Sequence, residues 1–241
     1  DISQPAILVV SWMAHTVLTE TVEPLQFAAT AGLSLGEYTA LIAAGALDFE
    51  NALRLVRLRG EAMQAASDAR AGGMVALIGA DEAGGDALCA AVRADDEVLQ
   101  VANLNSAGQV VIAGDQAACD RAVATAREHG IRRAMPLRVA GAFHTAHMAP
   151  AAERLGAALA YTPFADAKVP VYANVTARPV TAAAEIRDLL IRQLTEPVRF
   201  AASVTAMHEA GIDTFWELGP GRSLSGMIGR TLSDVTCGNV A

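Results

Sequence analysis

The order of apolar segments of strand and helix length is the strongest constraint on the fold of this chain. One stretch of the sequence predicts strands at 74–78, 98–103, 109–113 and 132–137, with helices at 82–93 and 116–129. The resulting order, β-α-β-β-α-β, is that of a ferredoxin-like unit. Gly72-Gly73 separates this stretch from the sequence before it. We therefore expect a small subdomain over residues 72–137, within the usual size of such units.

Strands and helices also alternate on both sides of this stretch. The first predicted helix begins at Gln4-Pro5. The other predicted helices cover 37–44, 50–67, 149–159, 182–194, 198–209 and 223–232. The predicted strands are 26–31, 169–173 and 214–218. Strands separated by helices imply a parallel sheet with helices on both faces. We expect an α/β fold whose large subdomain is formed by residues 1–71 and 138–241.

Charge and composition exclude several classes of function. The net charge is −8 and the sequence contains no basic run, so nucleic acid is not an expected partner. No apolar stretch reaches the length of a membrane span. The three cysteines, Cys89, Cys119 and Cys237, form neither a disulfide framework nor a metal-ligand spacing. We expect reduced thiols in a cytoplasmic protein, with no membrane partner and no metal site.

A serine lies between two glycines where a predicted strand meets a predicted helix. The segment Gly32-Leu33-Ser34-Leu35-Gly36 fits G-x-S-x-G, the nucleophile elbow, in which a tight turn projects the serine hydroxyl at a helix N-terminus. The amide of Leu35 could then donate to a developing oxyanion. The five residues alone also fit an ordinary turn, and it is the strand–turn–helix context that favours the elbow.

A serine nucleophile needs a base, and a buried arginine would indicate an acidic substrate. His144 lies in a non-helical segment after the small subdomain and could return to the elbow, while His147 is the second candidate. Arg59 lies in an otherwise apolar helix. It is either a solvated side chain or a fork that binds a carboxylate through two hydrogen bonds.

Six sequence blocks resemble the malonyl-CoA:acyl carrier protein transacylases of fatty acid and polyketide synthesis. Together they extend over nearly the whole chain in the order typical of that family. The blocks are Gly32 to Tyr38 (GLSLGEY), Leu58 to Gly60 (LRG), Asn103 to Gly114 (NLNSAGQVVIAG), Gly141 to Thr145 (GAFHT), Arg192 to Leu194 (RQL) and Glu217 to Gly221 (ELGPG).

The resemblance implies a role for each matching residue. Ser34 would be the nucleophile and His144 its base, with the main-chain carbonyl of Gln193 in place of the acid of a Ser-His-Asp triad. Arg59 would hold the free malonyl carboxylate. Phe143 would favour malonyl over methylmalonyl by crowding an α-methyl group. The implied fold is an α/β-hydrolase-like domain with a ferredoxin-like insert.

The implied reaction is ping-pong transfer through a malonyl ester on Ser34. The acyl donor would be malonyl-CoA and the acceptor the phosphopantetheine thiol of an acyl carrier protein, with no metal or redox cofactor. Two alternatives stay open: a serine esterase or thioesterase with the same elbow, and a non-catalytic protein that binds the carrier.

The sequence departs from the family at two points. Leu33 stands where the family usually has His before the serine, which changes the local polarity. The family's opening strand and Gly-Gln-Gly-Ser-Gln loop, which supplies a second oxyanion donor, are not in this sequence. We expect the natural protein to be longer than these 241 residues.

Overall fold

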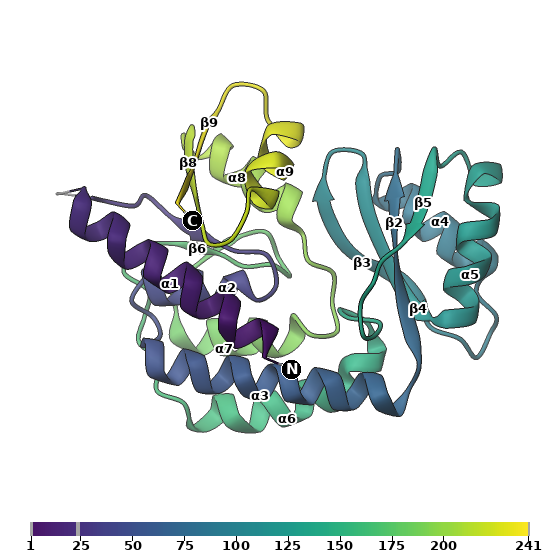
Figure 1. The fold of residues 1–241 in the computed structure, drawn as a ribbon, viewed down its shortest axis with the longest axis horizontal. Coiled ribbons are helices and arrows are strands. Elements are labelled where there is room, and N and C mark those ends of the chain that lie inside the picture. The colour runs from purple at the N-terminus through teal and green to yellow at the C-terminus, as the bar shows by residue number, and fades with distance from the viewer. Residues whose placement is uncertain (1, 23–24, 241) are drawn as a thin grey trace.

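The computed structural model describes residues 2–22 and 25–240 as a mixed α/β protein (Figure 1). Its helices are α1 (Ser3–Thr21), α2 (Gly36–Ala43), α3 (Phe49–Ala69), α4 (Glu82–Val92), α5 (Gln116–Thr125), α6 (Ala149–Tyr161), α7 (Ala183–Arg192), α8 (Phe200–Glu209) and α9 (Ser223–Thr231), with the 3-10 turns η1 (Ala126–His129) and η2 (Ala146–Met148). Its strands are β1 (Thr30–Ala31), β2 (Gly72–Ile78), β3 (Leu99–Ser106), β4 (Gln109–Asp115), β5 (Arg133–Pro136), β6 (Val171–Tyr172), β7 (Pro179–Val180), β8 (Thr214–Leu218) and β9 (Thr236–Val240). The α/β class predicted from the sequence is therefore confirmed.

The segment from β2 to β5 forms a four-stranded sheet beside the rest of the chain (Figure 1). Its strand order is β3-β4-β2-β5, and the neighbouring strands are antiparallel. The elements follow the order that the sequence predicts. The predicted helix 116–129 is divided into α5 and η1, and Gly130, with φ 75°, ends it in the left-handed region that glycine adopts readily.

Both faces of this sheet are buried because side chains alternate along each strand. On β2, Val75 and Leu77 contribute to the core shared with α4 and α5. Met74 and Ala76 point to the opposite face, in a cluster that includes Ala142. That second cluster packs the sheet against the segment that carries His144, and so helps to position it.

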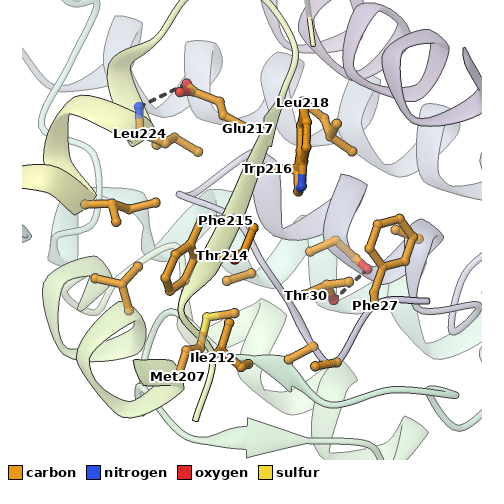
Figure 2. A pocket seen from close by; sticks show the side chains of 18 of the residues that line it. Phe27, Thr30, Met207, Ile212, Thr214, Phe215, Trp216, Glu217, Leu218 and Leu224 are labelled. Atoms are coloured by element: carbon orange, nitrogen blue, oxygen red, sulfur yellow. Dashed lines mark hydrogen bonds between the residues drawn. The ribbon is translucent and has the colours of Figure 1, made fainter. Parts of the chain in front are cut away.

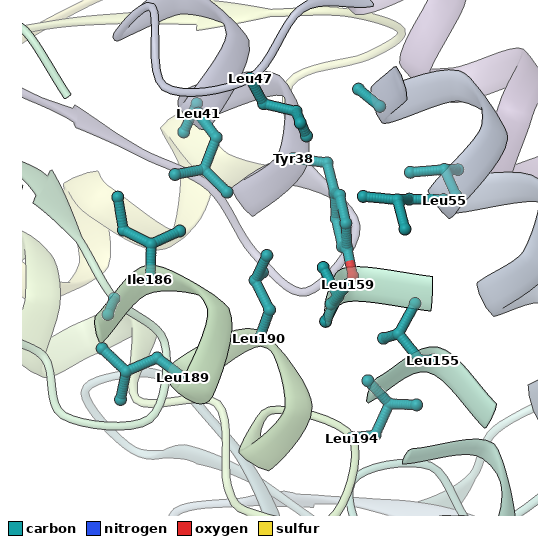
Figure 3. Close-up of a cluster of buried hydrophobic side chains, with 14 of the residues drawn as sticks. Tyr38, Leu41, Leu47, Leu55, Leu155, Leu159, Ile186, Leu189, Leu190 and Leu194 are labelled. Carbon is teal, nitrogen blue, oxygen red and sulfur yellow. The ribbon is translucent and has the colours of Figure 1, made fainter. Parts of the chain in front are cut away.

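The largest core lies among α2, α3, α6 and α7. Figure 3 shows the ring of Tyr38, fully buried, among leucines that include Leu55, Leu155 and Leu190. Because Tyr38 belongs to the first turn of α2, its burial fixes the start of that helix. The elbow that precedes α2 is thus attached directly to this core.

The strands outside the β2–β5 segment are short. β1 pairs with β6 in parallel, β6 pairs with β7 antiparallel, and β8 pairs with β9 in parallel. The expected parallel sheet is therefore seen only in part: two of these pairs are parallel, but among the described residues they lie in two separate small sheets. The predicted strands 26–31 and 169–173 were too long, and β7 and β9 were not predicted. Residues 25–29 line a groove instead of pairing with a neighbouring strand.

This groove lies between β1 and β8 and has a volume of about 440 Å³ (Figure 2). Phe27 and Thr30 line one side, and Phe215 and Trp216 line the other. Among the described residues, β1 pairs only with β6 and β8 only with β9, so each strand has one unpaired edge.

Within residues 2–22 and 25–240, no helix is long and apolar enough to cross a bilayer.

Replacing Leu155 with alanine should cost about 2–5 kcal/mol of unfolding free energy, because a fully buried leucine leaves a cavity when it is truncated. Leu137→Ala is the matched control, since that side chain is 37% exposed. Denaturant unfolding of both variants gives the comparison. Equal losses at the two positions would contradict the assignment of this core.

Candidate active site

Ser34 occupies a sharp turn between β1 and α2. Its φ is 52°, in the left-handed region that few residues other than glycine adopt. The turn is closed by the amide of Gly36, which donates to the carbonyl of Leu33 at 2.9 Å. A Cβ on Gly32 would lie 2.0 Å from the carbonyl carbon of Gly36, so the two backbones approach too closely for any side chain at position 32. The geometry is that of a nucleophile elbow.

The hydroxyl of Ser34 contacts a histidine that is itself held by the main chain. Ser34 Oγ lies 2.9 Å from Nε2 of His144, and Nδ1 of His144 lies 2.7 Å from the carbonyl oxygen of Gln193. A carbonyl only accepts, so Nδ1 carries the proton and Nε2 presents a lone pair to the serine. Burial lowers the pKa of His144 to about 4, the nearby Arg59 adds to this, and the hydrogen bond to Gln193 opposes it. The ring is therefore neutral at neutral pH.

Arg59 lies fully buried beside Ser34. Nη2 donates to Ser34 Oγ at 2.8 Å and to Oε1 of Gln193 at 3.0 Å, and Nη1 donates to Oε1 of Gln4 at 2.6 Å. Among the described residues, no carboxylate lies within 4.0 Å of this guanidinium. A buried charge without an ion-pair partner is costly. The site therefore favours an anionic ligand next to Ser34.

The other candidates from the sequence are placed differently. His147 does not face the serine: its Nε2 lies 3.4 Å from Oδ1 of Asp115. Leu35 directly precedes α2, at the positive end of the helix. Phe143 is partly buried and packs against two core clusters. Leu33 packs in the apolar cluster of α8 and β8.

Three polar side chains of this site were not found by sequence reasoning. They are Gln4 on α1, Glu37 on α2 and Asn174 after β6. Gln193 Nε2 donates to Oε2 of Glu37 at 2.6 Å, and the side chain of Asn174 bonds to the main chain of the elbow. Asn174 could have been predicted from the sequence, because a polar residue just after a parallel strand often lies at the functional edge of a sheet.

The groove between β1 and β8 is separate from this constellation. It touches the elbow glycines Gly32 and Gly36, but Ser34, His144 and Arg59 do not line it. The described residues contain no group of three or more His, Cys, Asp or Glu side chains arranged to hold a metal. The groups that meet at the elbow are a serine hydroxyl, a neutral imidazole and a guanidinium.

A family model described as an acyl transferase domain matches residues 1–241. The chain belongs to the acyl transferase family.

Relatives of this acyltransferase are named malonyl CoA-acyl carrier protein transacylase. The protein from Bacillus subtilis is 43% identical over 226 residues, which are 94% of this chain and 71% of the relative. That from Escherichia coli K12 is 41% identical over 234 residues, 97% of this chain and 75% of the relative. The acyltransferase thus resembles one group of enzymes along nearly its whole length.

Solved structures give the same relationship. A malonyl-transacylase in complex with a type II polyketide synthase acyl-carrier protein superposes with a TM-score of 0.94 at 39% identity, covering 99% of this chain and 76% of that one. A malonyl-CoA:acyl carrier protein transacylase from Xanthomonas oryzae gives a TM-score of 0.94 at 42% identity, covering 99% and 76%. The resemblance deduced from six sequence blocks is confirmed, and the protein is an acyltransferase.

In this acyltransferase, Gly32→Ala should distort the elbow, because the added Cβ would overlap the backbone of Gly36. Gly36→Ala is the matched control, since a Cβ there meets nothing within 4 Å. We expect Gly32→Ala to lose at least about 10²-fold in acylation rate, the scale of a 1 Å misplacement of reacting groups. Mass spectrometry of samples quenched at set times measures the acylation rate of both variants. Equal rates in the two would mean that the close approach of Gly32 and Gly36 does not shape the turn at Ser34.

Proposed function

We propose that this acyltransferase carries a malonyl group from malonyl-CoA to the phosphopantetheine thiol of an acyl carrier protein, through an ester on Ser34. The observation that carries the proposal is the contact of Arg59 with the nucleophile. A buried guanidinium 2.8 Å from Ser34 Oγ favours an acyl group that ends in a carboxylate. The names of the relatives agree with this substrate.

The proposed architecture has two subdomains. Residues 72–137 would form a ferredoxin-like subdomain, supported by the strand order β3-β4-β2-β5 and by α4 and α5 packing on one face. Residues 1–71 and 138–241 would form an α/β-hydrolase-like subdomain, supported by the elbow between β1 and α2. The fold alone does not determine the reaction, since one fold can host many.

In the first half-reaction, Nε2 of His144 accepts the proton of Ser34, and Oγ forms a bond to the thioester carbonyl carbon. The carbonyl oxygen becomes an oxyanion next to the amide of Leu35. The carbon–sulfur bond then breaks. Coenzyme A leaves as the thiol with the proton from His144, and the malonyl ester remains on Ser34.

The second half-reaction reverses these roles. The phosphopantetheine thiol gives its proton to Nε2 of His144, and its sulfur attacks the ester carbonyl. The bond to Oγ breaks, and Ser34 recovers its proton from the imidazolium. The carbonyl of Gln193 keeps the ring in one tautomer throughout, because it accepts from Nδ1 in every step. These steps need no resident metal or redox cofactor.

Arg59 and Phe143 would select the acyl group. The malonyl carboxylate lies only two carbons beyond the ester oxygen, so a guanidinium that touches Oγ can reach it. Gln4 and Gln193 hold the two terminal nitrogens of Arg59 in place. Phe143 directly precedes His144 in the chain, and its ring would restrict an α-methyl group on the substrate.

Two other functions would use parts of this site. An esterase or thioesterase would share the elbow, but a neutral acyl group would leave the charge of Arg59 without a partner. A protein that only binds the carrier would not need the contact between Ser34 and His144. Acyl transfer accounts for both features. We further propose that it takes place in the cytoplasm, in line with the free thiols of Cys89, Cys119 and Cys237.

Ser34→Ala should abolish covalent loading by malonyl-CoA, because the hydroxyl that becomes the ester is removed. Intact-mass spectrometry measures the gain of one malonyl group per chain, and circular dichroism tests the fold of the variant. Ser11→Ala is a control, since Ser11 is also a buried serine but lies on α1. Full loading of Ser34→Ala would refute the role of this residue.

Arg59→Ala should reduce the preference for malonyl over acetyl transfer by about thirtyfold or more, which corresponds to the lower end of roughly 2–5 kcal/mol for a lost buried charge contact. Arg57→Ala is the matched control on the same helix, because that side chain is 75% exposed and pairs with Glu61. Competition between the two thioesters gives the ratio directly. A ratio that stays constant in Arg59→Ala would make Arg59 a structural residue only.

A further inference from the structure

Glu37 is a buried carboxyl group directly behind the nucleophile. It lies in the first turn of α2 and is 3% exposed. Its Oε2 accepts from Nε2 of Gln193 at 2.6 Å and from the main-chain amide of Asn174 at 3.4 Å. Among the described residues, no lysine or arginine lies within 4.0 Å of it. A buried acid without an ion pair is costly to keep, so its contacts call for a functional explanation.

Gln193 is the residue that this carboxyl group orients. An ionised carboxylate can only accept hydrogen bonds, so it forces the amide nitrogen of Gln193 to face it. The amide oxygen must then point the other way, toward Nη2 of Arg59. The same amide nitrogen also donates to the carbonyl of Ser34 at 3.0 Å, and the main-chain carbonyl of Gln193 holds His144. One amide orientation thus satisfies Arg59, Ser34 and Glu37 together.

Asn174 extends the same arrangement to the strained turn. Its Oδ1 accepts from the amide of Ser34 at 2.6 Å, and its Nδ2 donates to the carbonyl of Gly32 at 2.6 Å. These two bonds clamp the elbow on both sides of Leu33 and oppose relaxation of Ser34 from φ 52°. The main-chain amide of Asn174 points at Glu37. The carboxyl group therefore contacts both residues that hold the reacting groups.

We propose that Glu37 is a positioning residue, which through Gln193 and Asn174 holds Ser34, His144 and Arg59 in their mutual arrangement. The inference rests on the proposed function, because it assigns Glu37 to the same nucleophile and base. The proposed role requires a hydrogen-bond acceptor at position 37. Glutamine can supply an acceptor oxygen without the charge, whereas alanine supplies neither.

The ionisation of Glu37 gives a signature that packing alone would not produce. Burial raises the pKa of Glu37 to about 7, while its bonds to Gln193 and Asn174 and the charge of Arg59 oppose this rise. Tyr38 and His144 are the other titratable groups of this region, and their pKa values lie far from 7 in opposite directions. Protonation of Glu37 adds a donor and removes the charge that strengthens its bonds to Gln193 and Asn174, although one oxygen can still accept. The reactivity of Ser34 should therefore rise as the pH increases through about 7.

The test measures the rate at which Ser34 is labelled by a fluorophosphonate, a probe of serine nucleophilicity that needs no malonyl group. The proteins compared are the unmodified protein, Glu37→Gln, Glu37→Ala and the control Glu50→Gln. Glu50 is a suitable control position because its side chain is 75% exposed. We expect Glu37→Ala to lose at least about tenfold in labelling rate, since small misplacements of reacting groups are costly. Glu37→Gln keeps an acceptor oxygen but not the charge. At every pH it should therefore show the rate that the unmodified protein has at low pH, above that of Glu37→Ala and without the inflection near pH 7.

Wild-type rate and inflection in Glu37→Ala would overturn the inference. So would an inflection that persists in Glu37→Gln, and this variant still gives an answer if Glu37→Ala does not fold. Loading with malonyl-CoA is measured in parallel on the unmodified protein. If the phosphonate labels Ser34 but malonyl-CoA does not, the proposed substrate is wrong, while the role of Glu37 is still judged from the labelling rates.

Discussion

The left-handed turn at Ser34 is the constraint on which the rest of the site depends. A serine with φ 52° is held there only if its surroundings oppose relaxation. The contact between Gly32 and Gly36 leaves the turn no room to open toward that side. Tyr38 anchors the following helix in the main core. The strain is thus supported by packing, and the hydroxyl is presented to His144 without the cost of ordering a loop when substrate binds.

The charges around Ser34 support the proposal that this site binds a malonyl group rather than a neutral acyl group. Burial lowers the pKa of His144 to about 4, so the ring is neutral at neutral pH and keeps a free lone pair on Nε2. Arg59 contributes to that lowering and also leaves a positive charge beside the reacting oxygen. A carboxylate that binds there would compensate the charge of Arg59. The same group would then be positioned for attack, which joins selectivity to reactivity in one contact.

Periodicity and turn chemistry predicted much of the fold from the sequence. The helix-and-strand order of 72–137 and the turn at Ser34 depend on local patterns, and both appear in the structure. The extent of β1 could not be predicted, because pairing depends on which strand lies beside it. The contacts of Glu37 with Gln193 and Asn174 join residues that are 156 and 137 positions apart. Local sequence does not reveal contacts between residues so far apart, and Gln193 was singled out only through the family resemblance, since every residue carries a carbonyl.

The central claim is that Ser34 holds a malonyl ester that a thiol, and not water, removes. The most direct test isolates protein loaded with malonyl-CoA, removes the free thioester and adds a carrier protein bearing phosphopantetheine. Intact mass spectra of both proteins are followed over time. The account predicts that the malonyl mass leaves this chain and appears on the carrier, much faster than it is lost to buffer or to a carrier without phosphopantetheine. Loss at the same rate with and without the thiol, with nothing gained by the carrier, would contradict it.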